Sequence, residues 1–201
     1  MKIINIKLLS LVSVLCLLMV CLISCDSGST HSEHATNKIE TITGELVNNA
    51  PSPDANYGGN VGDICLPMQL ETFSGDTYNI AQNRGKVTVL NFWGEWCGYC
   101  LVEMPEFDRV AEEYKNELSV VAVHSLSGMD QGIAYVNKNY ADSKIIFAKD
   151  LSVYGQTYYG MLGGDGSYPR TIIIDKSGAV VFSQYGAMSY DALVEAITPY
   201  L

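Results

Sequence analysis

Positive charge is scarce in this sequence. Twelve Lys and Arg residues stand against 22 Asp and Glu residues in a chain of 201, which gives a formal net charge of −10. Two of the lysines lie in the first segment, so the remainder of the chain is more acidic still. Direct binding to nucleic acid or to an anionic lipid surface relies on clustered basic side chains. The composition therefore argues against both as the main role.

Cysteine and histidine are also few, with six and three residues respectively. The cysteines are too scattered for a disulfide-dense scaffold. A zinc site on Cys97 and Cys100 lacks a second ligand pair at suitable spacing, and c-type haem attachment requires a histidine where Leu101 stands. Gly160–Gly166 leads into a predicted strand rather than a helix, which argues against a phosphate-binding loop. We expect no metal ion and no separate cofactor.

The N-terminus has the pattern of an export signal. Two lysines precede Leu8–Ile23, an uncharged run of 16 residues that is short for a membrane span and suited to a signal-peptide core. The run ends in Leu22-Ile23-Ser24-Cys25, which resembles a bacterial lipobox. This resemblance implies that residues 1–24 are a lipoprotein signal peptide and that Cys25 is lipidated. The alternative is an uncleaved anchor, and both place the remainder on the extracytoplasmic face of the bacterial cell membrane.

The rest of the chain divides into a tether and one domain. Residues 25–60 are rich in Ser, Thr, Asn and Gly without sustained periodicity, which predicts a flexible tether. Residues 61–201 have the pattern of a compact α/β domain, with a continuous apolar strand over Lys86–Trp93. We expect further strands over Met68–Phe73, Thr77–Ile80, Leu118–His124, Lys144–Ala148, Arg170–Asp175 and Ala179–Tyr185, and helices over Cys97–Asn116, Gln131–Asn139, Val153–Tyr159 and Tyr190–Leu201. This order predicts a mixed central sheet with helices on both faces.

The buried strand is followed by Trp93-Gly94-Glu95-Trp96-Cys97-Gly98-Tyr99-Cys100, which marks a turn and the start of a helix. Two cysteines at this spacing can close a small disulfide ring. We expect Cys97 to lie in the exposed first turn, where unpaired N–H groups and the helix dipole lower its pKa. This predicts thiol–disulfide exchange in which Cys97 attacks and Cys100 resolves the mixed disulfide.

Glu103 is the candidate proton acceptor for Cys100. The two residues are three apart on the predicted helix, so their side chains share a face. A carboxyl group partly buried beside a thiol has a raised pKa and can accept its proton. The alternative is a solvated Glu103 that is favoured only by the helix dipole.

Several motifs together resemble a known family. Asn91-Phe92-Trp93-Gly94-Glu95-Trp96-Cys97-Gly98-Tyr99-Cys100, then Glu103-Met104-Pro105 and later Tyr168-Pro169, are similar to the thioredoxin fold and to its membrane-anchored TlpA/ResA-like reductases. The resemblance implies a central mixed sheet flanked by helices, with a TlpA-like βα insertion and an N-terminal β extension. It also implies an active-site glutamate at position 103. In thioredoxin proper the place of Asn91 is usually a buried Asp, and Asn91 cannot ionise.

The resemblance also indicates how a substrate is held. Pro169 matches the cis-proline that lies opposite the cysteine pair and presents the backbone of the preceding residue, Tyr168, to an extended substrate strand. The alternative is a trans proline that opens the next strand. Trp96 and Tyr99 flank the cysteines and are expected to form an apolar rim for docking.

These observations predict an extracytoplasmic, lipid-anchored thiol–disulfide reductase, with a monomer expected. Its partners would be a disulfide-containing or oxidised client protein and a membrane electron donor of the CcdA/DsbD type. The client would serve cytochrome c maturation, or be a surface methionine sulfoxide or peroxide reductase. The alternatives are a disulfide-forming oxidase and a non-catalytic lipoprotein binding module. Cys65 is expected to be a buried unpaired thiol, and His124 a core or loop histidine.

Overall fold

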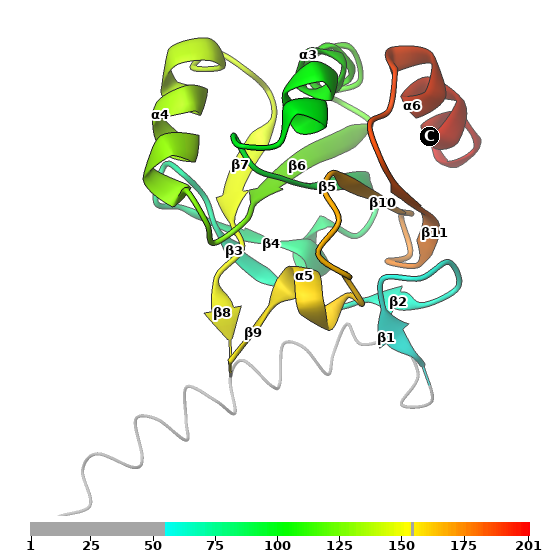
Figure 1. The fold of residues 1–201 in the computed structure, drawn as a ribbon. Helices are drawn as coiled ribbons and strands as arrows, with labels where there is room; N and C mark the ends of the chain where they lie inside the picture. The colour runs from blue at the N-terminus through cyan, green and yellow to red at the C-terminus, as the bar shows by residue number, and fades with distance from the viewer. Residues whose placement is uncertain (1–54, 154) are drawn as a thin grey trace, which may run out of the picture. The chain divides into compact units, whose positions relative to one another are not determined.

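A five-stranded sheet forms the centre of the described domain (Figure 1). The computed structural model describes residues 55–153 and 155–201, so the predicted signal peptide, Cys25 and most of the predicted tether lie outside the described residues. The strands of this sheet are β5 (Val87–Trp93), β6 (Leu118–His124), β7 (Ile146–Lys149), β10 (Arg170–Ile174) and β11 (Val180–Tyr185). The helices are α3 (Gly98–Glu113), α4 (Met129–Asn139), α5 (Tyr158–Met161) and α6 (Tyr190–Ile197), with 3₁₀ turns η1 (Ile80–Asn83) and η2 (Thr198–Tyr200).

The sheet is mixed, as the sequence predicts. Its order is β11-β10-β5-β6-β7, in which β5, β6 and β7 run parallel and β10 is antiparallel to both of its neighbours. The central strand β5 consists mainly of β-branched and aromatic residues, and all seven of its residues are buried. The α4–β7 segment adds the edge strand beyond β6. This is the thioredoxin fold with a βα insertion.

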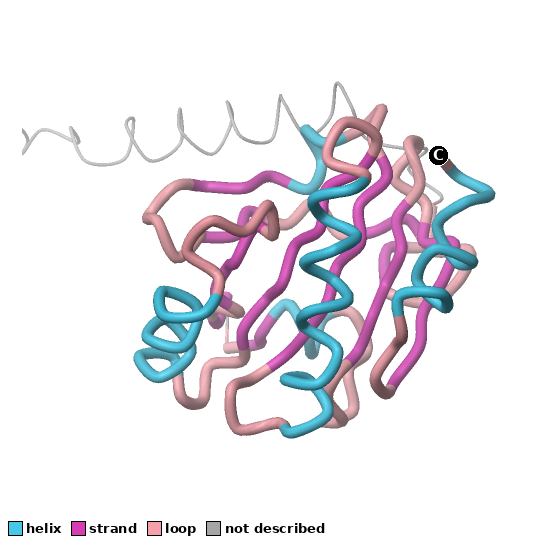
Figure 2. The backbone as a smooth tube through the Cα atoms, turned by 90° about the horizontal axis from the view of Figure 1, so that it is seen from above, coloured by secondary structure: helices cyan, strands magenta, loops and turns pink. Residues whose placement is uncertain are grey.

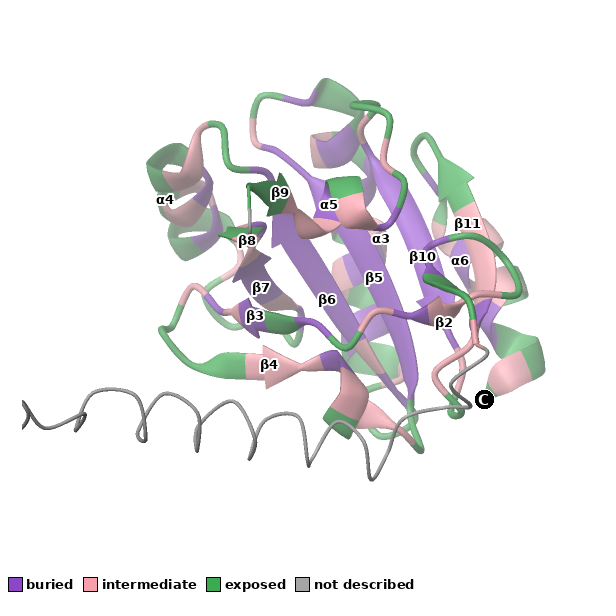
Figure 3. Ribbon diagram, turned by 90° about the horizontal axis from the view of Figure 1, so that it is seen from below, coloured by how far each residue is buried: buried purple, intermediate pink, exposed green. Residues whose placement is uncertain are grey.

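Each face of the sheet has its own core. Helices α3, α4 and α6 cover one face (Figure 2). Val89 and Trp93 of β5 belong to the core of this face together with Phe107 of α3. Among the described residues, the other face carries the short helices η1 and α5 together with small β elements (Figure 3). Phe92 belongs to the core of this face. Successive residues of a strand point to opposite faces. Asn91 therefore faces the helix side together with Val89 and Trp93.

Small β elements lie outside the central sheet. They are a β3–β4 hairpin (Gln69–Glu71 and Thr77–Asn79), a β8–β9 hairpin (Ser152–Val153 and Gln156–Thr157), and a parallel pair, β1 (Tyr57–Gly58) with β2 (Ile64–Cys65). The helix predicted over Val153–Tyr159 is wrong. Gly155 has a φ of 82°, which suits a tight turn between two strands, and the Thr157 side chain then caps the short helix α5. Helix α3 ends at Glu113, three residues before the predicted end.

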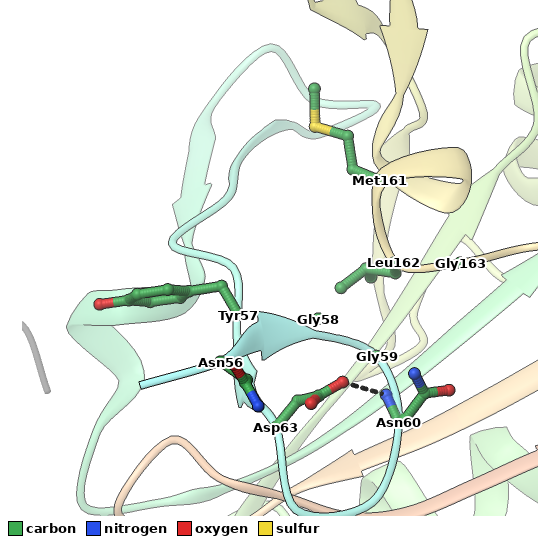
Figure 4. A pocket seen from close by; sticks show the side chains of 9 residues that line it. All are labelled: Asn56, Tyr57, Gly58, Gly59, Asn60, Asp63, Met161, Leu162 and Gly163. Carbon is green, nitrogen blue, oxygen red and sulfur yellow. Dashed lines mark hydrogen bonds between the residues drawn. The ribbon is translucent and has the colours of Figure 1, made fainter. Parts of the chain in front are cut away.

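The described structure includes residues ahead of Val61. Strand β1 pairs with β2, and the buried guanidinium of Arg170 donates to the carbonyl oxygens of Gly59 at 3.0 Å and Leu162 at 2.9 Å. Arg170 thus joins the N-terminal segment and the end of α5 to strand β10. These two segments also line an open cavity of about 330 Å³, in which the Asp63 carboxylate accepts a hydrogen bond from the Asn60 backbone (Figure 4).

None of the helices formed by residues 55–153 and 155–201 has the length and apolar character needed to cross a membrane.

Candidate active site

The two cysteines lie where β5 meets α3. Cys97 is the N-cap of α3, and its backbone is extended. Its sulfur accepts a hydrogen bond from the Cys100 N–H at 3.2 Å, and the two sulfurs form a disulfide with a Cα–Cα distance of 5.2 Å. Cys100 is fully buried and Cys97 is 7% exposed, so Cys97 is less accessible in this oxidised form than we predicted. It is nevertheless the more exposed of the two sulfurs.

Glu103 is buried in the layer between α3 and the sheet. It is 1% exposed, which excludes a solvated first-turn residue. Its Oε1 accepts from Asn91 Nδ2 at 2.8 Å, and its Oε2 accepts from the Met188 backbone N–H at 3.0 Å. Asn91 Nδ2 also lies 3.3 Å from the hydroxyl of Thr171 on β10. The central strand β5 therefore holds this carboxyl group directly, and its neighbour β10 supports it through Asn91.

Burial changes the acidity of Glu103. Loss of solvent disfavours the charged carboxylate and raises its pKa from 4.5 to about 7, against the lowering effect of the hydrogen bonds from Met188 and Asn91. A carboxyl group with this pKa exchanges a proton near neutral pH. Glu103 and Cys100 lie three residues apart in α3, so their side chains share one face of the helix. The arrangement suits a group that takes a proton from Cys100 and later returns it.

An aromatic stack connects the cysteine turn to helix α5. The Tyr168–Pro169 bond is cis, as the family resemblance implies. The Tyr168 ring meets Trp96 edge-on at a centroid distance of 5.3 Å and stacks on Tyr159 of α5 at 4.7 Å. The Tyr159 hydroxyl donates to the Ser167 carbonyl at 2.6 Å, which holds the loop before the proline. Sequence reasoning missed Tyr159, because nothing in its neighbourhood places it beside a residue nine positions later.

The two aromatic residues predicted to form a rim around the cysteines are both exposed. Trp96 is 52% exposed and Tyr99 is 74% exposed, and Leu126 from the β6–α4 turn is also exposed. The indole N–H of Trp96 donates to the Ser127 carbonyl at 3.3 Å, so the two turns are linked. Trp93, in contrast, is fully buried in the core.

Two further residues considered in the sequence, Cys65 and His124, do not contact the disulfide. Cys65 is a free, buried thiol, as predicted, and burial raises its pKa to about 12. His124 is buried at the end of β6, also as predicted, but it bonds to Glu95 of the cysteine turn, which sequence reasoning missed. Within the described part of the chain, no cluster of three or more His, Cys, Asp or Glu side chains is placed to hold a metal ion.

A paired C-x-x-C at a helix N-terminus, on a thioredoxin fold with a cis-proline loop beside it, defines a thiol–disulfide oxidoreductase. Comparison with known proteins agrees with this class. Residues 61–183 match the model of the AhpC/TSA family, and the chain belongs to that family.

The chain is similar to a thioredoxin-like protein and to thiol–disulfide oxidoreductases. The thioredoxin-like protein YneN of Bacillus subtilis is 31% identical over 130 residues, which cover 64% of this chain and 73% of the relative. The thiol–disulfide oxidoreductase ResA of Halalkalibacterium halodurans is 27% identical over 135 residues, covering 67% and 73%. Among solved structures, the exposed lipoprotein thioredoxin Etrx1 of Streptococcus pneumoniae superposes with a TM-score of 0.57 at 26% identity, covering 66% of this chain and 98% of that one.

Proposed function

We propose that this protein is a lipid-anchored reductase of protein disulfides on the extracytoplasmic face of the bacterial membrane. The observation that carries the proposal is the buried Glu103 carboxyl group, which has a pKa of about 7 and shares a helix face with Cys100. Resolution of a mixed disulfide requires a thiolate on a sulfur that is fully buried. Glu103 lies in the same buried layer and can accept the proton that Cys100 must lose.

In the proposed reaction the Cys97 thiolate attacks one sulfur of a client disulfide. A Cys97–client disulfide forms, and the other client sulfur leaves as a thiolate, which takes a proton from water. Cys100 then gives its proton to Glu103 and attacks the Cys97 sulfur. The Cys97–Cys100 disulfide closes, and the second client sulfur leaves as a thiolate. The dithiol loses two electrons and the client disulfide gains them.

The cis-proline loop and the aromatic rim are proposed to position the client. Trp96 and Tyr99 offer exposed rings beside the sulfurs, and Tyr168 packs against Trp96 at the edge of the site. An extended client segment bound along the Tyr168–Pro169 backbone would bring its disulfide to Cys97. A membrane electron donor of the CcdA/DsbD type would then reduce the Cys97–Cys100 disulfide again.

The reduction potential of the Cys97–Cys100 couple tests the direction of the reaction. The full chain is equilibrated in thiol buffers of known potential, and the oxidised and reduced forms of the peptide containing both cysteines are measured by mass spectrometry. We expect a value near or below roughly −220 mV, toward the thioredoxin end of the scale. A value near roughly −120 mV contradicts the proposal, because such a couple oxidises its clients.

The lipid anchor has its own test. With Cys25 lipidated, the full chain produced in bacteria is expected to partition into the detergent phase, since a diacylglyceryl group adds a large apolar surface. Cys25→Ser should move most of the protein into the aqueous phase, and Cys65→Ser serves as the matched control that should not. Equal partitioning of the Cys25→Ser variant and the unchanged protein argues against lipidation at this residue.

A further inference from the structure

A buried histidine at the end of β6 faces the cysteine turn. Strands β5 and β6 are parallel neighbours, and their register pairs Trp93 with His124, the last residue of each strand. His124 is fully buried, and its ring meets the Trp93 ring edge-on at a centroid distance of 4.8 Å. The imidazole therefore lies in the same layer as the turn that leads to Cys97.

The hydrogen bonds of His124 indicate the total charge of the His124 and Glu95 side chains. Its Nδ1 lies 2.7 Å from the Ser125 carbonyl oxygen, which only accepts, so Nδ1 carries a hydrogen. Its Nε2 lies 2.6 Å from Glu95 Oε2, and two bare lone pairs would repel at this distance, so the contact requires a hydrogen between the two atoms. The competing contact, in which Nε2 would accept from the Glu95 N–H, is longer at 3.4 Å. Imidazolium with carboxylate and imidazole with carboxylic acid both sum to zero charge. The pair is neutral in either form.

Helix α4 leaves space for both members of the pair. A Cβ on Gly132 would lie 2.3 Å from His124 Nε2, and a Cβ on Gly128 would lie 2.2 Å from Glu95 Oε1. Any larger residue at either position would displace the ring or the carboxyl group. Gly128 also has a φ of 78°, which disfavours other residues there.

Glu95 occupies a sensitive position. It lies two residues before Cys97, in the turn closed by the hydrogen bond from the Cys97 N–H to the Gly94 carbonyl at 3.1 Å. An uncompensated carboxylate at this position would disfavour the Cys97 thiolate, because like charges raise the pKa of a neighbouring acid. The Glu95 side chain is mostly buried, so solvent would screen its charge poorly.

We propose that His124 tunes the reactive thiol through Glu95: it neutralises the carboxyl group that would otherwise oppose the Cys97 thiolate. His124 touches neither sulfur in this role and acts as a positioning residue. The proposal rests on the proposed function only in taking Cys97 as the attacking sulfur. It explains why an acidic residue is tolerated in the turn of a thiol nucleophile.

The elements around the pair carry other titratable groups. They are Cys100 and Glu103 on α3, Tyr168 in the cis-proline loop, Asp130 in the first turn of α4, and Asp150 after β7, whose N–H donates to the His124 carbonyl. All of them are retained when only Glu95 and His124 are changed. A comparison among such variants therefore isolates the contribution of the pair.

The test is a double-mutant cycle that reads the Cys97 thiolate directly. The reduced full-length protein and its His124→Gln, Glu95→Gln and doubly substituted variants are treated with iodoacetamide from pH 5 to 10. Alkylation of Cys97 is then followed by mass spectrometry. We expect His124→Gln to shift the profile to higher pH and to slow the reaction at pH 7 about three- to tenfold, since it leaves Glu95 uncompensated. Glu95→Gln should stay within about twofold of the unchanged protein.

The doubly substituted variant distinguishes charge from packing. If the pair acts through charge, adding Glu95→Gln to His124→Gln restores the profile to within about twofold of the unchanged protein. Loss of packing alone would leave the double variant as slow as His124→Gln, and that outcome overturns the proposal. An unshifted His124→Gln profile overturns it as well. The assay needs neither client nor electron donor, so a failure of the proposed reductase function appears in the reduction potential and not here.

Discussion

Cys97→Ser is expected to abolish disulfide exchange, while Cys100→Ser is expected to stop the reaction at the mixed disulfide. A serine hydroxyl stays protonated at neutral pH and cannot attack a disulfide, so turnover of a chromogenic disulfide should fall on the order of a thousandfold or more in Cys97→Ser. Cys100→Ser retains the exposed nucleophile at the helix N-terminus. It should accumulate a covalent adduct with the substrate, visible as a mass increase that a reductant removes.

The remaining cysteine of the domain provides the control for this experiment. Cys65 is buried away from the disulfide, and its thiol has a pKa raised to about 12, so it carries almost no thiolate at neutral pH. Cys65→Ser should therefore turn over substrate within about twofold of the unchanged protein. If the stable adduct formed on Cys100 in the Cys97→Ser variant instead, the roles of the two sulfurs would be the reverse of those proposed.

Glu103→Gln is expected to slow the resolving step about ten- to a hundredfold near neutral pH, because a positioned base is lost. In the unchanged protein this step should speed up as pH rises through about 7, where Glu103 becomes a carboxylate able to take the Cys100 proton. The variant should lack that rise. Stopped-flow measurement of mixed-disulfide decay from pH 5 to 9 gives both profiles, and identical curves would remove Glu103 from the mechanism.

The same substitution should change how stability depends on pH. Glu103 has a folded-state pKa of about 7 against an ordinary value of 4.5, so the folded state holds its proton more tightly between these values. Its contribution to the free energy of unfolding is fully present below pH 4.5 and is lost as pH rises through 7, by about 3 kcal/mol. Asp150, whose pKa burial raises to about 6, acts in the same direction and remains in the variant. Denaturant unfolding of Glu103→Gln should thus show a weaker fall with pH, but not a flat line.

The fold of Glu103→Gln should be retained, since its surroundings can adapt. Both oxygens of Glu103 accept hydrogen bonds, whereas a glutamine offers one acceptor and one donor group. The buried Oδ1 of Asn91 has no partner among the described residues. A turn of the Asn91 amide would therefore let it accept from the glutamine. Asn91→Ala lacks this capacity and is the less suitable variant for separating catalysis from folding.

Much of the fold follows from local sequence pattern. The apolar run of β5 and the long amphipathic segment of α3 were predicted to within a few residues, since each is long enough for its periodicity to be clear. The Val153–Tyr159 region failed because a hairpin and a helix of four residues each contain too few positions for a period to emerge. The available signal was the glycine at position 155, because glycine often marks a turn. The helix prediction did not take it into account, and Gly155 adopts a left-handed conformation in the structure.

The candidate site also has a part that the sequence predicts and a part that it does not. Cys97, Cys100 and Glu103 lie within the first two turns of one helix, so spacing alone places them together. The Glu95–His124 pair joins residues 29 positions apart through the register of two parallel strands, which sequence pattern does not reveal. A usable signal was present: each residue stands at or just beyond the end of a neighbouring buried strand, where polar side chains from the two strands meet. The low exposure of Cys97 depends on the surrounding loops and had no local signal.

The Arg170 contact bears on how the domain is prepared without its anchor. A form trimmed to begin at Val61, where the composition changes, would remove Gly59 and with it one acceptor of a buried guanidinium. It would also remove strand β1 and the Asn56 carbonyl that accepts from the Ile64 N–H. Because Arg170 directly follows Pro169, the damage would reach the loop proposed to hold the client. A low activity in such a trimmed protein would then reflect where it was cut rather than its redox chemistry.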